Sequence, residues 1–84
     1  MYEVIFDEEA IDFLNTLPKE IKERIFKKII SAKENPLHFF ERLTSRSECK
    51  LRVGDYRVIA DIDSGQKKIR IIFVGHRKNI YDKI

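Results

Sequence analysis

Residues 50–59, Lys-Leu-Arg-Val-Gly-Asp-Tyr-Arg-Val-Ile, hold the end of one strand, a tight turn and the start of the next strand. Apolar residues alternate with Lys50 and Arg52 before the turn and with Arg57 after it, the period-two pattern of half-buried strands. Gly54-Asp55 between them is typical of a short hairpin turn. We therefore predict an antiparallel hairpin whose strands cover residues 49–53 and 56–63.

The segments on either side of this hairpin extend the prediction to the whole chain. Downstream, a turn at 64–66 and an apolar run at 68–74 predict a third antiparallel strand that ends at Gly75. Upstream, residues 2–6 favour a strand, and Asp7 suits the N-cap of a helix. Pro18 breaks that helix and opens a second one, which Asn35-Pro36 ends after about residue 33. Residues 37–47 show no regular pattern.

The expected order is thus β-α-α-β-β-β in a single α+β domain of residues 1–84, with a short helical C-terminal tail after Gly75. The two helices should form an antiparallel hairpin, since the link at Leu17-Pro18 is short. The meander should rest one face on this hairpin and leave the other to solvent or a ligand. The first strand should pair with a member of the meander, since its amides need partners.

Charge is distributed unevenly along the chain. Residues 1–41 carry 6 Lys/Arg against 9 Asp/Glu, whereas residues 42–84 carry 11 against 5. A basic half beside an acidic half points to a polyanionic partner on one side of the fold. The single cysteine, Cys49, forms no internal disulfide and is expected to be a structural strand residue. With neither a membrane span nor a signal peptide evident, a cytoplasmic protein is expected.

The basic residues of the second half are the candidates for chemistry. Arg side chains on an exposed sheet face offer a fixed fork of donors to phosphate oxygens, although a solvated, aggregation-resistant face is an equal alternative. Tyr81 stands one helical turn after Arg77, where it could act as a base or stack on a nucleobase, or simply anchor the C-terminus. His76 could transfer protons or merely cap the strand end. The wider basic cluster comprises Lys50, Arg52, Arg57, Arg70, His76, Arg77 and Lys78.

Motifs for other chemistries are missing from the sequence. It contains no phosphate-binding Gly-rich loop and no paired Cys/His spacing for a metal. Asp61 and Asp63 could bind a metal, but Ser64-Gly65 follows at once, and a polar hairpin end is favoured. A nuclease made from this chain would therefore have to work without a bound metal.

Three segments together resemble the RelE/ParE toxin superfamily, and specifically its RelE-like branch of mRNA interferases. Residues 50–59 are similar to its central signature, a basic strand, a Gly turn and then Tyr-Arg-Val. The run Ile72-Phe73-Val74-Gly75-His76-Arg77-Lys78-Asn79-Ile80-Tyr81 resembles its C-terminal signature. The N-terminal strand and helices also match, so the resemblance spans nearly the whole chain.

This resemblance implies the toxin of a type II toxin–antitoxin system, an endoribonuclease that cuts messenger RNA on the ribosome without a metal or cofactor. The RNA's own 2′-hydroxyl would attack the scissile phosphate. Arg57 would contact that phosphate, Arg77 would stabilise the leaving group or act as the acid, and Tyr81 would be the base or a stacking platform. The field around the RNA would come from Lys50, Arg52, His76 and Lys78.

The chain departs from the family pattern at a few positions. It has Glu48 where the best-known members are more basic, His76 rather than Lys after Gly75, and a shorter spacing from Arg77 to Tyr81 than in some members. These departures leave the assignment of the acid and the base open.

Partners and alternative functions also follow from the resemblance. The implied partners are the ribosome, mRNA and an acidic, partly disordered RelB-like antitoxin that covers the basic face and the helix hairpin. The alternatives are a ParE-like non-nuclease that inhibits DNA gyrase by protein contact, and an RNA-binding module without catalysis.

Overall fold

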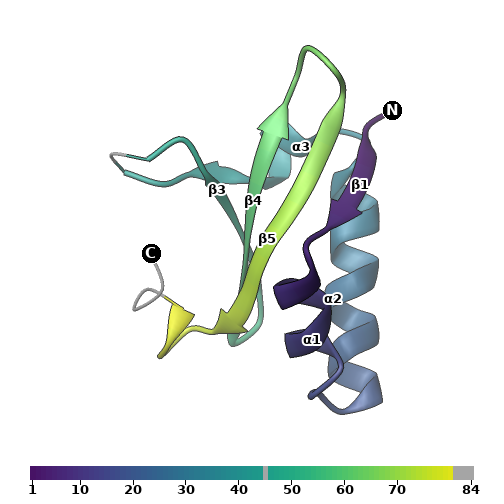
Figure 1. Ribbon diagram of the computed structural model, residues 1–84, viewed down its shortest axis with the longest axis vertical. Helices are drawn as coiled ribbons and strands as arrows, with labels where there is room; N and C mark the ends of the chain where they lie inside the picture. The colour runs from purple at the N-terminus through teal and green to yellow at the C-terminus, as the bar shows by residue number, and fades with distance from the viewer. Residues whose placement is uncertain (45, 81–84) are drawn as a thin grey trace.

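A five-stranded sheet with two helices on one of its faces makes up most of the protein (Figure 1). The structure is a computed structural model that describes residues 1–44 and 46–80. Over these described residues, every helix is too short or too polar to span a lipid bilayer. In chain order the elements are β1 (Glu3–Phe6), α1 (Glu8–Leu14), α2 (Lys19–Ala32), α3 (Pro36–Phe39), β2 (Glu41–Arg42), β3 (Cys49–Val53), β4 (Tyr56–Asp63) and β5 (Lys68–His76).

The sheet has the strand order β1-β5-β4-β3-β2, which confirms the predicted meander and the pairing of the first strand. The first strand lies parallel to β5, and the other neighbours are antiparallel. A parallel neighbour needs a crossover connection. The helix hairpin supplies part of that connection, and it covers the face of the sheet that would otherwise expose its apolar residues (Figure 1).

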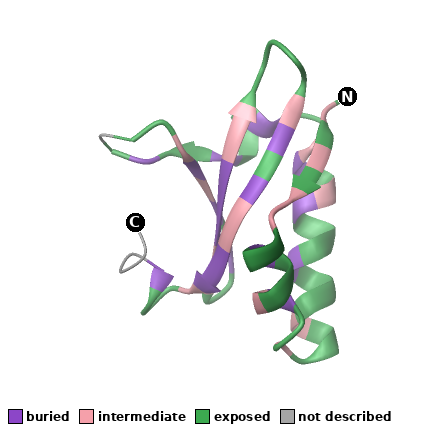
Figure 2. Ribbon diagram, viewed as in Figure 1, coloured by how far each residue is buried: buried purple, intermediate pink, exposed green. Residues whose placement is uncertain are grey.

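The main core lies between the helix hairpin and the sheet, and Figure 2 shows that both the helices and the strands contain buried residues. Ile25, Ile29 and Ala32 of α2 are fully buried, as their helical spacing predicts. They pack against Leu51, Val58 and other inward residues of the strands. The same alternation turns the intervening strand residues to the opposite face of the sheet.

Asp7 is the N-cap residue of the first helix, as predicted, but its bonding differs from that of a cap, and the predicted end of the last strand is wrong. Asp7 precedes α1, but its side chain does not cap the helix and instead accepts two hydrogen bonds from Arg70. Gly75 does not end the third meander strand, because β5 continues to His76, which pairs with Tyr56. Both differences come from partners distant in sequence.

The segment without a regular sequence pattern contains two short elements. A single helical turn, α3, begins at Pro36, and β2 pairs Glu41 with Lys50 and Arg42 with Cys49. A two-residue strand is too short to show the alternation that identifies longer strands. Its pairing adds a fifth strand beyond the predicted four.

Candidate nucleic-acid interface

The face of the sheet opposite the helices carries the basic residues of the central hairpin. On β3, Cys49, Leu51 and Val53 are buried in the core, so Lys50 and Arg52 project from the other face. Arg57 of β4 lies directly opposite Arg52 in the register of the two strands. The structure therefore brings three of the predicted basic residues to one face.

Hydrogen bonds to the backbone fix the position of Arg57. Its Nη1 donates to the carbonyl oxygens of Gly54 and Tyr56, each at 2.9 Å. Gly54 occupies the turn with a φ of 58°, a left-handed conformation that favours glycine. The turn thus holds the Arg57 guanidinium at the end of the hairpin without neutralising its charge.

Arg77 lies at the same end of the sheet as Arg57. Its backbone N–H donates to the Asp55 carbonyl oxygen at 2.7 Å, and its Nε lies 3.5 Å from Asp55 Oδ1. Both side chains are more than half exposed, so water screens this long ion pair and it holds Arg77 only weakly. The backbone bond, rather than the ion pair, ties Arg77 to the β3–β4 turn.

His76 turns away from the basic face of the sheet. It pairs with Tyr56, whose ring packs on the helix side, and the two rings meet edge to face with centroids 5.4 Å apart. The Nδ1 atom of His76 accepts a hydrogen bond from the Lys78 backbone N–H at 3.2 Å. These contacts favour the alternative of a residue that caps the strand end. Lys78 is exposed in the following turn, and Tyr81 lies outside the described residues.

A second, smaller apolar cluster lies on the same face of the sheet as these basic residues. Its buried members are Leu43, Ile59 and Ile80, and Phe73 packs against them. Ile80 reaches the sheet across Gly75, where an added Cβ would lie 2.7 Å from Ile80 Cδ1. The glycine in the Gly-His-Arg run therefore allows the C-terminal turn to fold onto the sheet. Sequence reasoning missed this cluster because Leu43 and Ile80 belong to segments without a regular period.

Arg70 does not belong to the basic cluster, although it was grouped with it from the sequence. Its Nε and Nη2 donate to the two carboxylate oxygens of Asp7 at 2.8 and 2.9 Å. The Arg70 hydrogen bond lowers the pKa of Asp7, and the same bond raises the pKa of Arg70. The positive charge of Arg70 is thus committed to a structural pair.

The other polar candidates have structural positions. Cys49 is buried in the core, and this burial raises the pKa of its thiol, as expected of an unreactive cysteine. Asp63 accepts hydrogen bonds from the backbone N–H groups of Gly65 and Gln66, so it shapes the hairpin end. Within residues 1–44 and 46–80 there is no group of three or more potential metal ligands.

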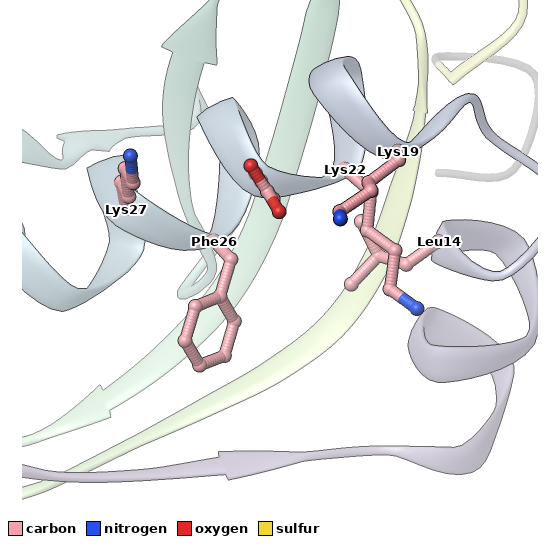
Figure 3. A pocket seen from close by; sticks show the side chains of 6 residues that line it. Leu14, Lys19, Lys22, Phe26 and Lys27 are labelled. Atoms are coloured by element: carbon pink, nitrogen blue, oxygen red, sulfur yellow. The ribbon is translucent and has the colours of Figure 1, made fainter.

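Two grooves flank α2 on different sides. The outer groove, of about 770 Å³, has Leu14 and Phe26 in its wall, with Lys19, Lys22, Lys27 and one carboxylate, Glu23, around it (Figure 3). Phe26 is 47% exposed there and stacks on Phe6 with centroids 6.0 Å apart. The other groove, of about 400 Å³, lies between α2 and the end of β3 and is mainly basic.

Comparison with known proteins agrees with this architecture. A family model described as "ParE toxin of type II toxin-antitoxin system, parDE" matches residues 4–81. The chain is similar to the RelBE2 toxin–antitoxin complex of Mycobacterium tuberculosis, with 26% identity, a TM-score of 0.83, and coverage of 90% of this chain and 98% of that one.

Two further solved structures give similar values. The intact E. coli RelBE complex matches with 25% identity and a TM-score of 0.76, covering 90% of this chain and 96% of the other. The archaeal RelE–RelB complex from Pyrococcus horikoshii OT3 matches with 25% identity and a TM-score of 0.75, covering 90% and 94%. No curated protein matches the chain.

Proposed function

Because the chain belongs to the RelE/ParE superfamily of toxins from type II toxin–antitoxin systems, we propose that it is a ribosome-dependent endoribonuclease that cleaves messenger RNA. The observation that carries this proposal is the cross-strand pair of Arg52 and Arg57. Like charges directly opposite each other destabilise a sheet. A phosphate bound between the two guanidinium groups would turn this repulsion into attraction, because each Arg offers a fork of donors.

The proposed reaction uses only groups of the RNA and of the protein. The 2′-hydroxyl oxygen attacks the neighbouring phosphorus and loses its proton to a base, which Tyr81 would supply if it is not a stacking platform. The bond from phosphorus to the 5′-oxygen breaks, which leaves a 2′,3′-cyclic phosphate. The departing 5′-oxygen takes a proton, or is stabilised, at Arg77. Arg57 holds the non-bridging oxygens, and Lys50 and Arg52 supply positive field, so charge stabilisation and positioning carry the catalysis.

A second candidate is a ParE-like inhibitor of DNA gyrase that acts by protein contact. The matching family model is named for ParE, whereas the similar solved structures are RelE complexes. The arginines around the β3–β4 turn favour the nuclease, because an inhibitor that works by protein contact does not need them.

Mapping message ends in a translating extract separates these functions. Codon-phased cuts are expected with the unchanged chain, and their rate should fall at least a hundredfold in Arg57→Ala and in Arg77→Ala. Lys67→Gln is a matched control, since it removes a cation from the β4–β5 turn at the other end of the sheet. Intact messages together with blocked DNA supercoiling would contradict the nuclease function and support the inhibition of gyrase. Bound but uncut RNA would indicate a binding module.

The antitoxin is proposed to dock in the outer groove beside α1 and α2. The similar M. tuberculosis, E. coli and P. horikoshii structures are complexes of a toxin with its antitoxin. The outer groove presents an apolar wall at Leu14 and Phe26, and the three lysines around it outnumber its one carboxylate, Glu23 (Figure 3). An amphipathic helix with an acidic rim complements this surface, because its apolar residues would fill the groove while its carboxylates meet the lysines.

A further inference from the structure

The groove between α2 and the end of β3 gathers positive charge from two elements. One side is lined by Arg24, Lys27, Lys28 and Ser31 of α2, and the other by Arg52, Val53 and Gly54. Among the described residues, no carboxylate lines it. Within residues 1–44 and 46–80, none of its four cations has an ion pair. Lys28 does lie over the Phe39 ring, at 5.7 Å from the centroid, but this contact leaves its charge in place.

Unpaired like charges around one groove repel each other in the free protein. Arg24 and Lys28 are four residues apart on α2, where like charges are mutually unfavourable. The groove also holds them near the sheet, since an added Cβ at Gly54 would lie 3.0 Å from Arg24 Nη1. A bound polyanion would relieve this repulsion, because it supplies the negative charge that the groove lacks.

The groove is continuous with the basic face through Arg52. That residue projects from the face that also carries Lys50 and Arg57, and it lines the groove as well. In the part of the chain that the structure describes, the short strand β2 pairs with Cys49 and Lys50 alone, and no strand covers the edge of β3 from residue 51 onward. An extended, flexible polyanion can therefore pass from the sheet face around this edge to α2.

We propose that this groove binds the phosphodiester backbone of RNA outside the nucleotides that are cleaved. This identification rests on the proposed function for the RNA, whereas the recognition of phosphate rests on the groove itself. Four of its seven lining residues are cations and Val53 is its one large apolar residue, whereas the outer groove has the exposed ring of Phe26 in its wall. Repeated phosphates suit such a surface better than an amphipathic helix does.

The test compares two charge-matched double variants on the same helix. R24Q/K28Q removes two cations from the groove, and K19Q/K22Q removes two from the outer side of α2. All four positions are exposed, and glutamine is a good helix former. Fluorescence anisotropy with a labelled single-stranded RNA of about 20 nucleotides, repeated from 0.1 to 1 M KCl, gives the salt dependence of affinity. Thermal unfolding shows that each variant is folded.

The groove variant should lose two phosphate contacts. The logarithm of the affinity decreases with the logarithm of the salt concentration, and for single strands each contact adds about 0.7 to the steepness of this line. The line for the groove variant should therefore be shallower by about 1.4. Over a tenfold change in salt, that difference corresponds to roughly 25-fold weaker binding at 0.1 M KCl. The control variant should retain the original slope.

The remaining outcomes decide against the groove or against the nuclease separately. The proposal that the groove binds RNA would be overturned by equal slopes in all three proteins or by an equal loss of RNA affinity in both variants. It would also be overturned if the groove variant lost binding to the antitoxin in place of binding to RNA. Equally tight binding of duplex DNA that also depends on the groove would overturn its assignment to RNA. Intact messages in the extract, together with a groove-dependent slope, would overturn the proposed nuclease alone.

Discussion

Arginines on neighbouring strands of this sheet have opposite roles, which depend on the partners that the fold gives them. Arg70 meets Asp7, 63 positions away in the chain, and its charge is used in a two-bond pair. Arg57 meets backbone carbonyl oxygens and another arginine, so its charge stays available. From the sequence alone both are basic residues in strands, because the parallel pairing that brings Asp7 to β5 leaves no local pattern.

The Asp7–Arg70 pair should make stability depend on pH. Hydrogen bonding from Arg70 lowers the Asp7 pKa in the folded chain, so the unfolded chain takes up the proton at a higher pH. The stabilisation is therefore complete above the ordinary Asp pKa of about 3.9 and is lost as the pH falls through the lowered folded value. Urea unfolding from pH 6 to pH 2 should show a gap between the unchanged chain and Arg70→Gln that narrows below about pH 4.

Two controls accompany this measurement. Asp7→Asn should reproduce the effect of Arg70→Gln, and combining both changes should add little, since each single change already breaks the pair. Lys67→Gln, which removes a cation from the exposed β4–β5 turn, should leave the pH profile unchanged. A gap between the unchanged chain and Arg70→Gln that stays constant down to pH 2 would contradict the expected linkage.

Among the elements, those with a clear period could be predicted and those set by distant contacts could not. Helix α2 and strands β3 and β4 follow from apolar spacing and turn residues within each segment. Strand β2 is defined by its pairing with β3. Strand β5 extends beyond Gly75 because His76 pairs with Tyr56 of β4. The convergence of Lys50, Arg52 and Arg57 was predictable from alternation and the turn. The basic groove was not, because it joins α2 to β3 across the fold.

The helix hairpin offers an element-level prediction through Phe26. Its spacing suggests a core position, yet it is 47% exposed and lies in the outer groove. If an antitoxin helix fills that groove, Phe26→Ala should weaken antitoxin binding about 30-fold, the effect of losing one aromatic hot spot worth about 2 kcal/mol. Calorimetric titration with the protein encoded by an adjacent small acidic reading frame would measure this change.

Leu37→Ala is the matched control for Phe26→Ala. Leu37 is 66% exposed in α3 and does not line the outer groove, so its removal tests the general effect of losing exposed apolar surface. Its antitoxin affinity should equal that of the unchanged chain. Equal affinities for all three proteins would instead place the antitoxin on another surface. Cleavage activity of free Phe26→Ala should be unchanged, because the outer groove lies apart from the basic face.

At the scale of the whole molecule, the charge asymmetry of the sequence does not divide the fold into an acidic and a basic side. The N-terminal 41 residues are net acidic, yet α2 within them supplies Arg24, Lys27 and Lys28 to the basic groove. Among the acidic residues of the first half, Asp7 is held in its pair with Arg70, and Glu41 lies opposite Lys50 in the register of β2 and β3. Folding thus joins cations from both halves of the chain around β3, where the positive field is stronger than the net charge of +3 suggests.

This concentration of charge predicts that RNA stabilises the entire domain against unfolding. A ligand that binds only the folded chain, at 100 times its dissociation constant, adds about 2.7 kcal/mol to the free energy of unfolding. For a domain of this size, that corresponds to a rise in Tm of roughly 10–20 °C. Differential scanning calorimetry with a non-cleavable 2′-deoxy or 2′-O-methyl oligonucleotide at 50 mM KCl should show the rise, and 0.5 M KCl should abolish most of it because counterion release drives the binding. A double variant, Arg52→Gln with Arg57→Gln, should show a smaller rise with the oligonucleotide, since the phosphate site is gone. Its Tm without the oligonucleotide should change little, because the relief of repulsion between the two arginines is offset by the loss of the two Arg57 hydrogen bonds to the backbone. A lower Tm for this variant without the oligonucleotide, together with an undiminished rise, would show that the paired arginines serve the fold and that the RNA binds elsewhere.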